Sequence, residues 1–556
     1  MYCRNCGRDI KDGTKFCPYC GGGQEITAIS VIEPVRVNQG AGPGPSAGQS
    51  ANSGFAHAKN NSKIKIPLLI ILAVVAVAVI GVLIFVLLDK PLPMQGGSSN
   101  YIFSEKGIDF LSSTNKSHVV HPNGKIDIVD SDIYMVQGSL NETKGAFLSR
   151  DDRDNMLLYH ASGNESVFVD RDQYIDAYLS ADGNSIVYVT DLGNYAISEP
   201  ATLNLYSGGE SQIISRDHNY YGGGGVAISP DGKTIIFTAD YNLDKDSYTT
   251  YIWENGKQNV LGDDMWPIAV SNGGKHIYYS DDGNVYVMEN GSKIRLNNAN
   301  AYTTYQFNCD FTSVLYSYEE SGKSPKTFIY EGGGDRIQID GYFYRMLVPT
   351  HVRSSYFSYL EGSSAINVKD FKDTFFASDS SIYYINSKYE THRVAKFDSD
   401  IQVAPDGKTV FFITSDSLYK INGTKPDSQR EEVVGDDDVV SYRILGNGNE
   451  LYYLNDYDEL FYKKGKNKAE LIGDVEYSEY RILESENRLL YIEDDELYYT
   501  KGAEKGTRVT GVYEDDMFFN SYYPLDRIFV GVSDGDEGVI YYMSSNGIDF
   551  KELGYN

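Results

Sequence analysis

The chain has 556 residues and a formal net charge of −29, with 41% hydrophobic and 23% charged residues. The acidic excess lies after residue 65, where 41 basic residues face 74 acidic ones, whereas residues 1–65 carry a net charge of +4. Such a field disfavours nucleic acid and anionic surfaces as partners of the C-terminal part, and favours solubility or cationic ligands. That part contains one cysteine, Cys309, so we expect it to be held by its own core rather than by disulfides.

The N-terminal head contains two C-x2-C pairs, each followed by a glycine. Cys3 and Cys6 form the first pair, and Cys17 and Cys20 form the second pair after ten intervening residues. Four thiolates at this spacing predict a closed tetrahedral site for one structural Zn²⁺, without the open position that catalysis needs. A pair of redox-active thiols is the alternative interpretation.

The head resembles the short bacterial zinc-ribbon family, whose pattern is C-x2-C-G, a polar turn and F-C-x2-C-G. Gly13 and Phe16 match the middle of that pattern. The resemblance implies a zinc ribbon over residues 1–23, and so small a module depends on its metal for folding. We expect this ribbon to contact a cytoplasmic protein rather than nucleic acid.

The composition of two segments predicts linkers. Residues 24–62 include a run of glycine, proline and serine that cannot bury enough surface to offset its chain entropy, which predicts a flexible tether. A shorter spacer, residues 91–100, contains a Gly-Gly-Ser-Ser sequence.

Between these linkers, residues 63–90 contain an uninterrupted apolar run over residues 66–88. As a helix at about 1.5 Å per residue, this run is long enough to span a hydrocarbon core of about 30 Å. A cleaved signal peptide would be shorter and nearer the N-terminus, and a buried core helix is the remaining alternative. Lys59, Lys63 and Lys65 precede the run, so the positive-inside tendency predicts a single-pass protein with a cytoplasmic N-terminus and an extracytoplasmic C-terminal domain.

Residues 101–556 are a series of short β-rich runs separated by turns that contain Asp, Asn and Gly. The recurring unit is an apolar strand, a turn of the type Ser-Pro-Asp-Gly-Lys, a second strand, an acidic turn and a further strand. Asp-Gly and Asn-Gly supply the positive φ that tight hairpins need, and a repeat of about 40–50 residues with four strands is typical of a β-propeller. The clearest copies are 226–238 and 403–413, and weaker copies lie at 179–191, 270–289, 444–464, 482–501 and 523–543.

The turn followed by a hydrophobic strand resembles the TolB-type and WD-like propeller repeats of bacterial envelope proteins, although the Gly-His and Trp-Asp dipeptides of true WD repeats do not recur. The resemblance implies a mainly β fold with a propeller of about 7–10 blades. Two smaller propellers are the alternative, because nine or ten copies exceed the usual single ring.

Candidate chemistry in the propeller region is sparse. Asp240, Asn242, Asp244 and Asp246 place oxygen donors at alternate positions, as in the first part of a calcium-binding loop. The loop lacks the glycine and the bidentate glutamate of that motif, so a solvated hairpin tip is the favoured interpretation and Ca²⁺ the alternative.

Three further motifs are weak. His118 and His121 form an isolated H-x2-H pair, and the glycine run 222–225 lacks the lysine and serine or threonine of a phosphate loop. The two G-x-S-x-G matches, residues 44–48 and 531–535, lie in the glycine-rich linker and between two β-rich runs rather than at a strand-to-helix elbow, which argues against a hydrolase of the prolyl-oligopeptidase type. We therefore predict no catalytic residues.

The combined expectation is a membrane-anchored binding, scaffold or sensor protein of the bacterial cell envelope, whose propeller binds an envelope protein, peptide or glycan. An envelope enzyme that acts on glycan or peptide at the propeller mouth is the alternative. In a third possibility, the ribbon recruits a cytoplasmic partner while the propeller senses the outside.

Overall fold

The computed structural model places all of its described residues in one of two compact units, Phe85–Asn556, the other unit being Met1–Ile84. The described residues are 107–113, 116–192, 200–220, 224–297, 302–319, 323–349, 363–378, 380–435, 438–446, 448–475, 479–483, 487–512, 517–519, 527–533 and 539–553.

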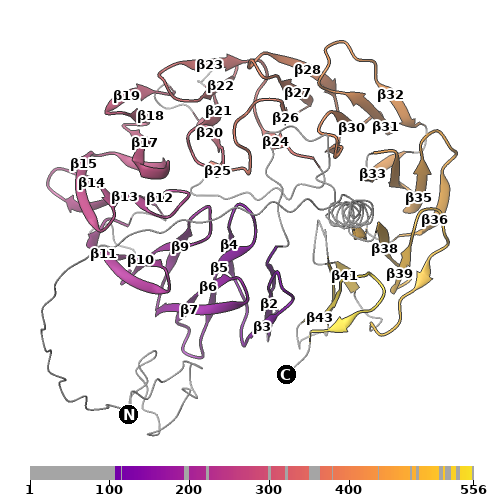
Figure 1. Ribbon diagram of the computed structural model, residues 1–556, viewed down its shortest axis with the longest axis horizontal. Coiled ribbons are helices and arrows are strands. Elements are labelled where there is room, and N and C mark those ends of the chain that lie inside the picture. Colours follow the sequence, from indigo (N-terminus) through magenta and orange to yellow (C-terminus); the bar gives the residue numbers. More distant parts are fainter. Residues whose placement is uncertain are drawn as a thin grey trace, which may run out of the picture. The chain divides into compact units, whose positions relative to one another are not determined.

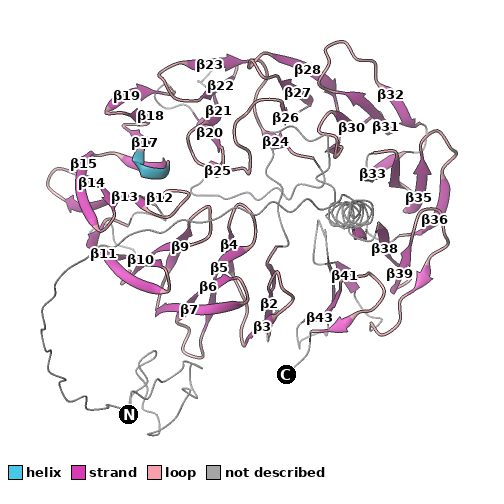
Figure 2. Cartoon of the chain, viewed as in Figure 1, coloured by secondary structure: helices cyan, strands magenta, loops and turns pink. Residues whose placement is uncertain are grey.

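The described part of Phe85–Asn556 is almost entirely β-structure, with 44 strands in ten sheets and one short 3-10 helix (Figures 1 and 2). Nearly all strand pairs are antiparallel, as the predicted hairpins require. One eight-stranded sheet contains two consecutive four-stranded units, so the described residues form eleven units, which we number as blades 1 to 11 in chain order.

The first six blades span residues 109–339. Blade 1 contains β1 (Asp109–Leu111), β2 (Ser117–Val120) and β3 (Ile126–Val129); blade 2 contains β4 (Met135–Gly138), β5 (Lys144–Arg150), β6 (Met156–Ser162) and β7 (Glu165–Asp172); blade 3 contains β8 (Asp176–Leu179), β9 (Ser185–Thr190), β10 (Ala201–Ser207) and β11 (Glu210–His218). Blade 4 contains β12 (Val226–Ile228), β13 (Thr234–Asn242), β14 (Ser247–Glu254) and β15 (Lys257–Asp263); blade 5 contains β16 (Trp266–Val270), the helix η1 (Asn272–Gly274), β17 (His276–Asp281), β18 (Asn284–Glu289) and β19 (Ser292–Arg295); blade 6 contains β20 (Tyr302–Phe307), β21 (Val314–Glu319), β22 (Lys326–Tyr330) and β23 (Arg336–Ile339).

The remaining five blades span residues 345–552. Blade 7 contains β24 (Arg345–Leu347), β26 (Thr374–Ala377), β27 (Ser381–Ile385) and β28 (Thr391–Lys396); blade 8 contains β29 (Ile401–Val403), β30 (Thr409–Thr414), β31 (Ser417–Asn422) and β32 (Glu431–Val434); blade 9 contains β33 (Val439–Leu445), β34 (Glu450–Asn455), β35 (Glu459–Lys464) and β36 (Glu470–Asp474). Blade 10 contains β37 (Tyr480–Leu483), β38 (Arg488–Glu493), β39 (Glu496–Thr500) and β40 (Thr507–Arg508), and blade 11 contains β41 (Met517–Phe519), β42 (Ile528–Ser533), β43 (Val539–Ser544) and β44 (Lys551–Glu552).

The hairpin between the first two strands of a blade has the predicted turn chemistry. In blade 4, Ser229 Oγ donates to Asp231 Oδ1 (2.7 Å) and accepts from the amide of Thr234 (3.0 Å), which closes the turn with side-chain hydrogen bonds. Gly232 has φ +70°, and a Cβ at this position would collide with Ser185 Oγ of blade 3. Glycine is therefore required both by the backbone angle and by the approach of the preceding blade.

Consecutive blades are joined by buried hydrophobic clusters, and the last blade packs on the first. Each neighbouring pair shares such a cluster, from the one between blades 1 and 2 to the one between blades 10 and 11. The pair formed by blades 11 and 1 shares a cluster that contains Leu111, Val120, Phe529, Tyr541 and Leu553. The blades therefore form a single closed series, as in a propeller.

The junction between blades 11 and 1 is made by side chains, with no strand exchange among the described residues. Arg527 is 5% exposed and lies directly before β42. Its Nε donates to Asp109 Oδ2 of β1 (2.7 Å), Nη1 donates to the carbonyl of His121 (2.8 Å), and Nη2 donates to the carbonyl of Gly107 (2.5 Å). One buried guanidinium with hydrogen bonds from all three of its nitrogens thus connects the two ends of the described series.

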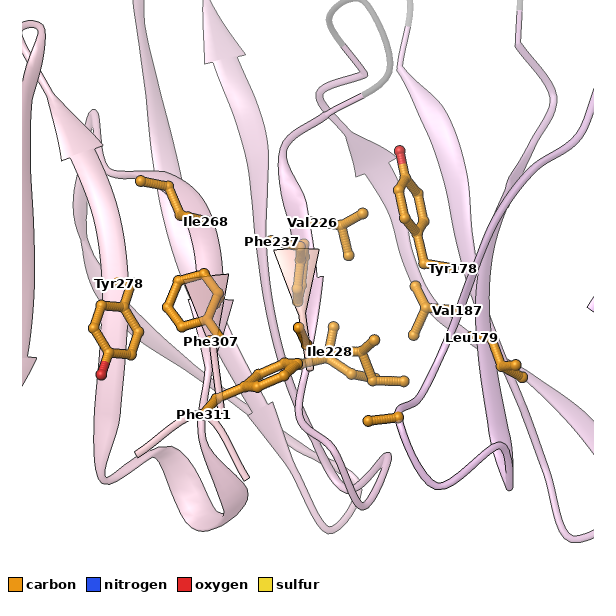
Figure 3. Packing of buried hydrophobic residues seen from close by; sticks show 14 of the residues in the cluster. Tyr178, Leu179, Val187, Val226, Ile228, Phe237, Ile268, Tyr278, Phe307 and Phe311 are labelled. Atoms are coloured by element: carbon orange, nitrogen blue, oxygen red, sulfur yellow. The ribbon is translucent and has the colours of Figure 1, made fainter. Parts of the chain in front are cut away.

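Tyrosine suits these interfaces because its ring packs in the core while its hydroxyl reaches a polar group at the margin. Tyr188 and Tyr316 are fully buried, and their hydroxyls donate to Asp170 Oδ2 (2.8 Å) and to the carbonyl of Leu296 (3.1 Å), respectively. Figure 3 shows the largest cluster, in which Tyr178 lies beside Val226 with its hydroxyl pointing away from the apolar side chains.

Blade 7 departs from the regular order. After β24 the chain returns to blade 6, where β25 (Ser363–Ala365) pairs with β20 in parallel and becomes a fifth strand. Residues 366–371 then contribute Ile366, Val368 and Phe371 to the cluster between blades 6 and 7. This insertion separates the first strand of blade 7 from its second, so no short hairpin joins them.

The structure confirms the mainly β prediction and corrects its count. The range of 7–10 blades was too low, because the described residues form eleven, and the alternative of two smaller propellers was wrong, because the blades form one closed series. The described residues contain no helix with the length and apolar character of a membrane span. The span predicted over residues 66–88 lies outside the described residues.

Candidate functional site

The two histidines of the H-x2-H pair lie on opposite faces of blade 1. His118 lies on β2 with its ring against Tyr541 of blade 11 (6.2 Å between ring centroids). His121 Nε2 lies 2.8 Å from Asp127 Oδ2, on the side facing blade 2, where Asp127 also accepts from the amide of Ser166 (2.6 Å). Side chains that are three residues apart in an extended chain point to opposite faces of the sheet. Because the two histidines face away from each other, they cannot bind one metal ion together.

The aspartate-rich loop of blade 4 is a capped hairpin between β13 and β14. Asn242 Oδ1 accepts from the amides of Asp244 and Lys245 (3.1 Å each), while Asp240 accepts from Tyr251 and Asp246 from Tyr241. The oxygens therefore point to separate partners, and the calcium hypothesis gains no support from this geometry. Across the described ranges, no group of three or more His, Cys, Asp or Glu side chains could hold a metal ion.

The described part of the glycine run, Gly224 and Gly225, has a packing role. A Cβ on Gly224 would lie 2.6 Å from the ring of Trp266, and a Cβ on Gly225, where φ is +83°, would lie 2.6 Å from Thr238 Oγ1. The two glycines thus allow the backbone before β12 to pass close to the side chains of Trp266 and Thr238. Cys3, Cys6, Cys17 and Cys20, the predicted zinc ligands, lie outside the described residues.

A partly buried polar group is centred on Asp176, the first residue of β8. Its Oδ2 accepts from the hydroxyl of Tyr178 (2.7 Å), two residues along the strand and therefore on the same face. The same oxygen accepts from the hydroxyl of Tyr220 (3.1 Å), which belongs to the segment leading from blade 3 to blade 4. A third ring, Tyr174, stands close enough to interact with Tyr178 and Tyr220.

The electrostatics of this group, which we call the Asp176 cluster (Asp176, Tyr174, Tyr178 and Tyr220), follow from burial. Burial raises the pKa of the Asp176 carboxyl above its usual range, and the hydrogen bonds from Tyr178 and Tyr220 offset only part of that effect. Burial and the neighbouring carboxylate also raise the pKa of Tyr178 and of Tyr220, so both hydroxyls remain donors. Asp176, Tyr174 and Tyr220 nevertheless retain partial exposure to solvent.

The strand that carries the cluster is positioned by the preceding blade. Gln137 of β4 donates through Nε2 to the carbonyl of Ala177 (2.7 Å) and accepts through Oε1 from the amide of Leu179 (2.7 Å). Both peptide groups flank Tyr178, so the amide side chain locks the backbone on which the cluster is built. The cluster is therefore held in place by the preceding blade.

Blade 8 presents an equivalent arrangement with a different outcome. Asp400 lies six residues before Asp406 of the hairpin turn, as Asp176 lies six residues before Asp182. Here Arg443 of β33 provides a cation, with Nη1 3.5 Å from Asp400 Oδ2. The aspartate of blade 8 is therefore part of an ion pair between blades.

Sequence reasoning missed the Asp176 cluster. The sequence offered one clue, which was the position of Asp176 in the repeat. Asp176 lies six residues before Asp182 of the hairpin turn, and that turn was recognised from the sequence. The partner Tyr220 is 44 residues away in the chain, and so distant a contact cannot be read from a local motif.

The zinc-ribbon domain family matches residues 2–22, which contain all four N-terminal cysteines. No relative was found among curated protein sequences.

Many solved structures show a fold similar to this chain. They include the β-propeller domain of the Trilobed protease from Pyrococcus furiosus (12% identity, 61% of this chain and 98% of that chain, TM-score 0.30). TolB from Acinetobacter baumannii (13% identity, 58% and 78%, TM-score 0.25) and an acylaminoacyl peptidase (11% identity, 55% and 52%, TM-score 0.31) are also similar. These TM-scores are below 0.5, and the propeller-like fold of this chain follows from its own strand pairing and closed blade order.

Proposed function

We propose that this protein is a single-pass, membrane-anchored binding or scaffold protein of the cell envelope, with an extracytoplasmic propeller-like domain that binds an envelope protein, peptide or glycan. The observation that carries the binding role is the Asp176 cluster, a pre-organised polar group that remains accessible on the first strand of blade 3. Buried polar groups that cost stability are typical of sites kept for function.

The membrane anchor is supported by sequence. Residues 66–88 are apolar throughout, and the lysines that precede them favour a cytoplasmic N-terminus. With that orientation, the acidic propeller-like domain lies outside and the zinc ribbon lies in the cytoplasm.

The ribbon is proposed to hold one structural Zn²⁺ through Cys3, Cys6, Cys17 and Cys20, in agreement with the family match over residues 2–22. In this role zinc orders the cytoplasmic head so that it can contact a protein partner. Cys3→Ser in the full-length chain should lower the bound zinc to well below one ion per chain, measured by metal analysis. An unchanged zinc content would contradict the four-cysteine site.

The orientation is tested by protease treatment of intact cells, with antibodies against the ribbon and against the propeller-like domain. We expect the propeller-like domain to be cleaved while the ribbon is protected, and lysed cells to show that the ribbon is cleavable. Protection of the propeller-like domain and loss of the ribbon would contradict the proposed sidedness. Turnover of peptidoglycan fragments by the purified chain would favour the enzyme alternative over a binding role.

A further inference from the structure

Asp176 is a partly buried carboxylate that no positive charge compensates within the described structure. Within the described ranges its interacting groups are two tyrosine hydroxyls and a backbone amide, and no lysine, arginine or histidine contributes to its electrostatics. Hydroxyl donors stabilise a carboxylate less than a paired cation does, particularly where burial has removed part of its hydration. The cluster is therefore suited to a cation supplied from outside the chain.

The neighbouring arginines of blade 2 are already engaged elsewhere. Arg150 pairs with Asp154 and stacks over the ring of Tyr134 at 5.2 Å, and Arg171 pairs with Asp151. Neither forms an ion pair with Asp176 in the described structure. A cation that enters the cluster would thus meet an ionisable oxygen that the protein's own basic groups leave uncompensated.

The three rings provide the second element of recognition. The face of a tyrosine ring attracts an ammonium group, and this attraction grows when the site is partly desolvated. Tyr174 and Tyr220 are partly exposed, whereas Tyr178 is 6% exposed and fixed by the core (Figure 3). The cluster therefore combines one carboxylate with three tyrosine side chains, and carboxylates and aromatic rings are the groups that proteins use to bind organic ammonium ions.

The charge of the whole domain acts in the same direction. The chain after residue 65 carries 74 acidic and 41 basic residues, so its field attracts cations and repels anions. Anionic ligands would have to overcome both this field and the local carboxylate.

We infer that the Asp176 cluster is a recognition site for an organic ammonium group, presented either by a free amine or by the side chain of lysine in a peptide. The ammonium group donates to the Asp176 carboxylate while its carbon chain lies against the rings of Tyr174 and Tyr220. This inference rests on the proposed binding function and specifies the class of ligand.

The test is calorimetric titration of the full-length protein in detergent with three probes: n-butylamine, N-acetyl-lysine amide and N-acetyl-norleucine amide. We expect the two cationic probes to bind saturably and the neutral norleucine probe to bind at least tenfold more weakly. Preference for the lysine probe over butylamine would assign the source to peptides, and the reverse to free amines. Equal binding of the norleucine and lysine probes, or no binding of either cation, would overturn the inference.

Two variants assign the effect to Asp176. Asp176→Asn preserves the shape and should weaken the lysine probe at least tenfold, whereas the matched variant Asp400→Asn should leave its affinity unchanged. The wild-type affinity should also fall when the pH is lowered and Asp176 becomes protonated, a readout that needs no variant. Unchanged affinity in Asp176→Asn would overturn the inference, while the cell-surface protease experiment would still test the proposed function separately.

Discussion

Asp176 in blade 3 and Asp400 in blade 8 occupy the same position in the repeat but have different surroundings. Asp400 lies 3.5 Å from the guanidinium of Arg443, which the next blade supplies. Asp176 is hydrogen-bonded by the hydroxyls of Tyr178 and Tyr220 instead. The repeat thus tolerates a carboxylate at this position in two ways, one with an ion pair across an interface and one with hydroxyl donors and no compensating cation.

A third aspartate, Asp109, extends the comparison to the junction of blades 11 and 1. Its partner Arg527 is 5% exposed and donates in addition to backbone carbonyls of blade 1. The three aspartates thus form a series from full compensation by a buried arginine, through a looser and more exposed ion pair, to no compensating cation. Substitutions along this series should have effects of different size and sign.

The largest effect is expected for Arg527→Gln. The substitution leaves Asp109 and the carbonyls of Gly107 and His121 without their shared donor at the junction that closes the blade series. Loss of one partner of a buried ion pair typically costs about 3–5 kcal/mol, so denaturant unfolding of the full-length protein should show a decrease of that order. A decrease of less than about 1 kcal/mol would show that the hydrophobic cluster alone holds this junction.

A smaller effect with the opposite sign is expected for Asp176→Asn. Asparagine can still accept from Tyr178 and Tyr220 but carries no charge, so the variant avoids the cost of burying an uncompensated carboxylate. We expect a gain in unfolding free energy on the order of 1 kcal/mol at neutral pH, together with loss of amine binding. A variant that is less stable than wild type would show that the charge of Asp176 is compensated in the folded protein.

The smallest effect is expected for Arg443→Gln. Arg443 and Asp400 are each about one-third exposed, so solvent screens their attraction. Exposed pairs of this kind contribute about 0.2–1 kcal/mol, and thermal unfolding should show a loss within that range. A loss as large as that of Arg527→Gln would show that the two ion pairs contribute equally to stability despite their different burial.

The repeats and their turns could be predicted because the chemistry is local. Ser229, Asp231 and Gly232 lie within a few residues of one another, and the hairpin they form is the one expected. The blade count could not be predicted as reliably, because blade 1 turns at His121-Pro-Asn-Gly-Lys instead of the repeat signature. In blade 7, moreover, an insertion separates the first two strands.

The Asp176 cluster escaped prediction for a different physical reason. The chain contains 78 acidic residues, and no property of the sequence around Asp176 shows that its neighbours will include no cation. That property depends on which side chain the next blade supplies, as the contrast between Tyr220 and Arg443 shows. Compensation of charge is a property of the folded interface.

The most direct test of the uncompensated charge is the pH dependence of the stability difference between wild type and Asp176→Asn. Because burial raises the pKa of Asp176 in the folded state, the folded wild-type protein holds its proton more tightly than the unfolded chain, and wild-type stability falls as the pH rises through that pKa. The advantage of the variant should therefore be smallest near the usual pKa of aspartate, about 4, and should grow as the pH rises above it, measured by denaturant unfolding. An advantage that stays constant over this range, or that grows as the pH falls, would contradict the account.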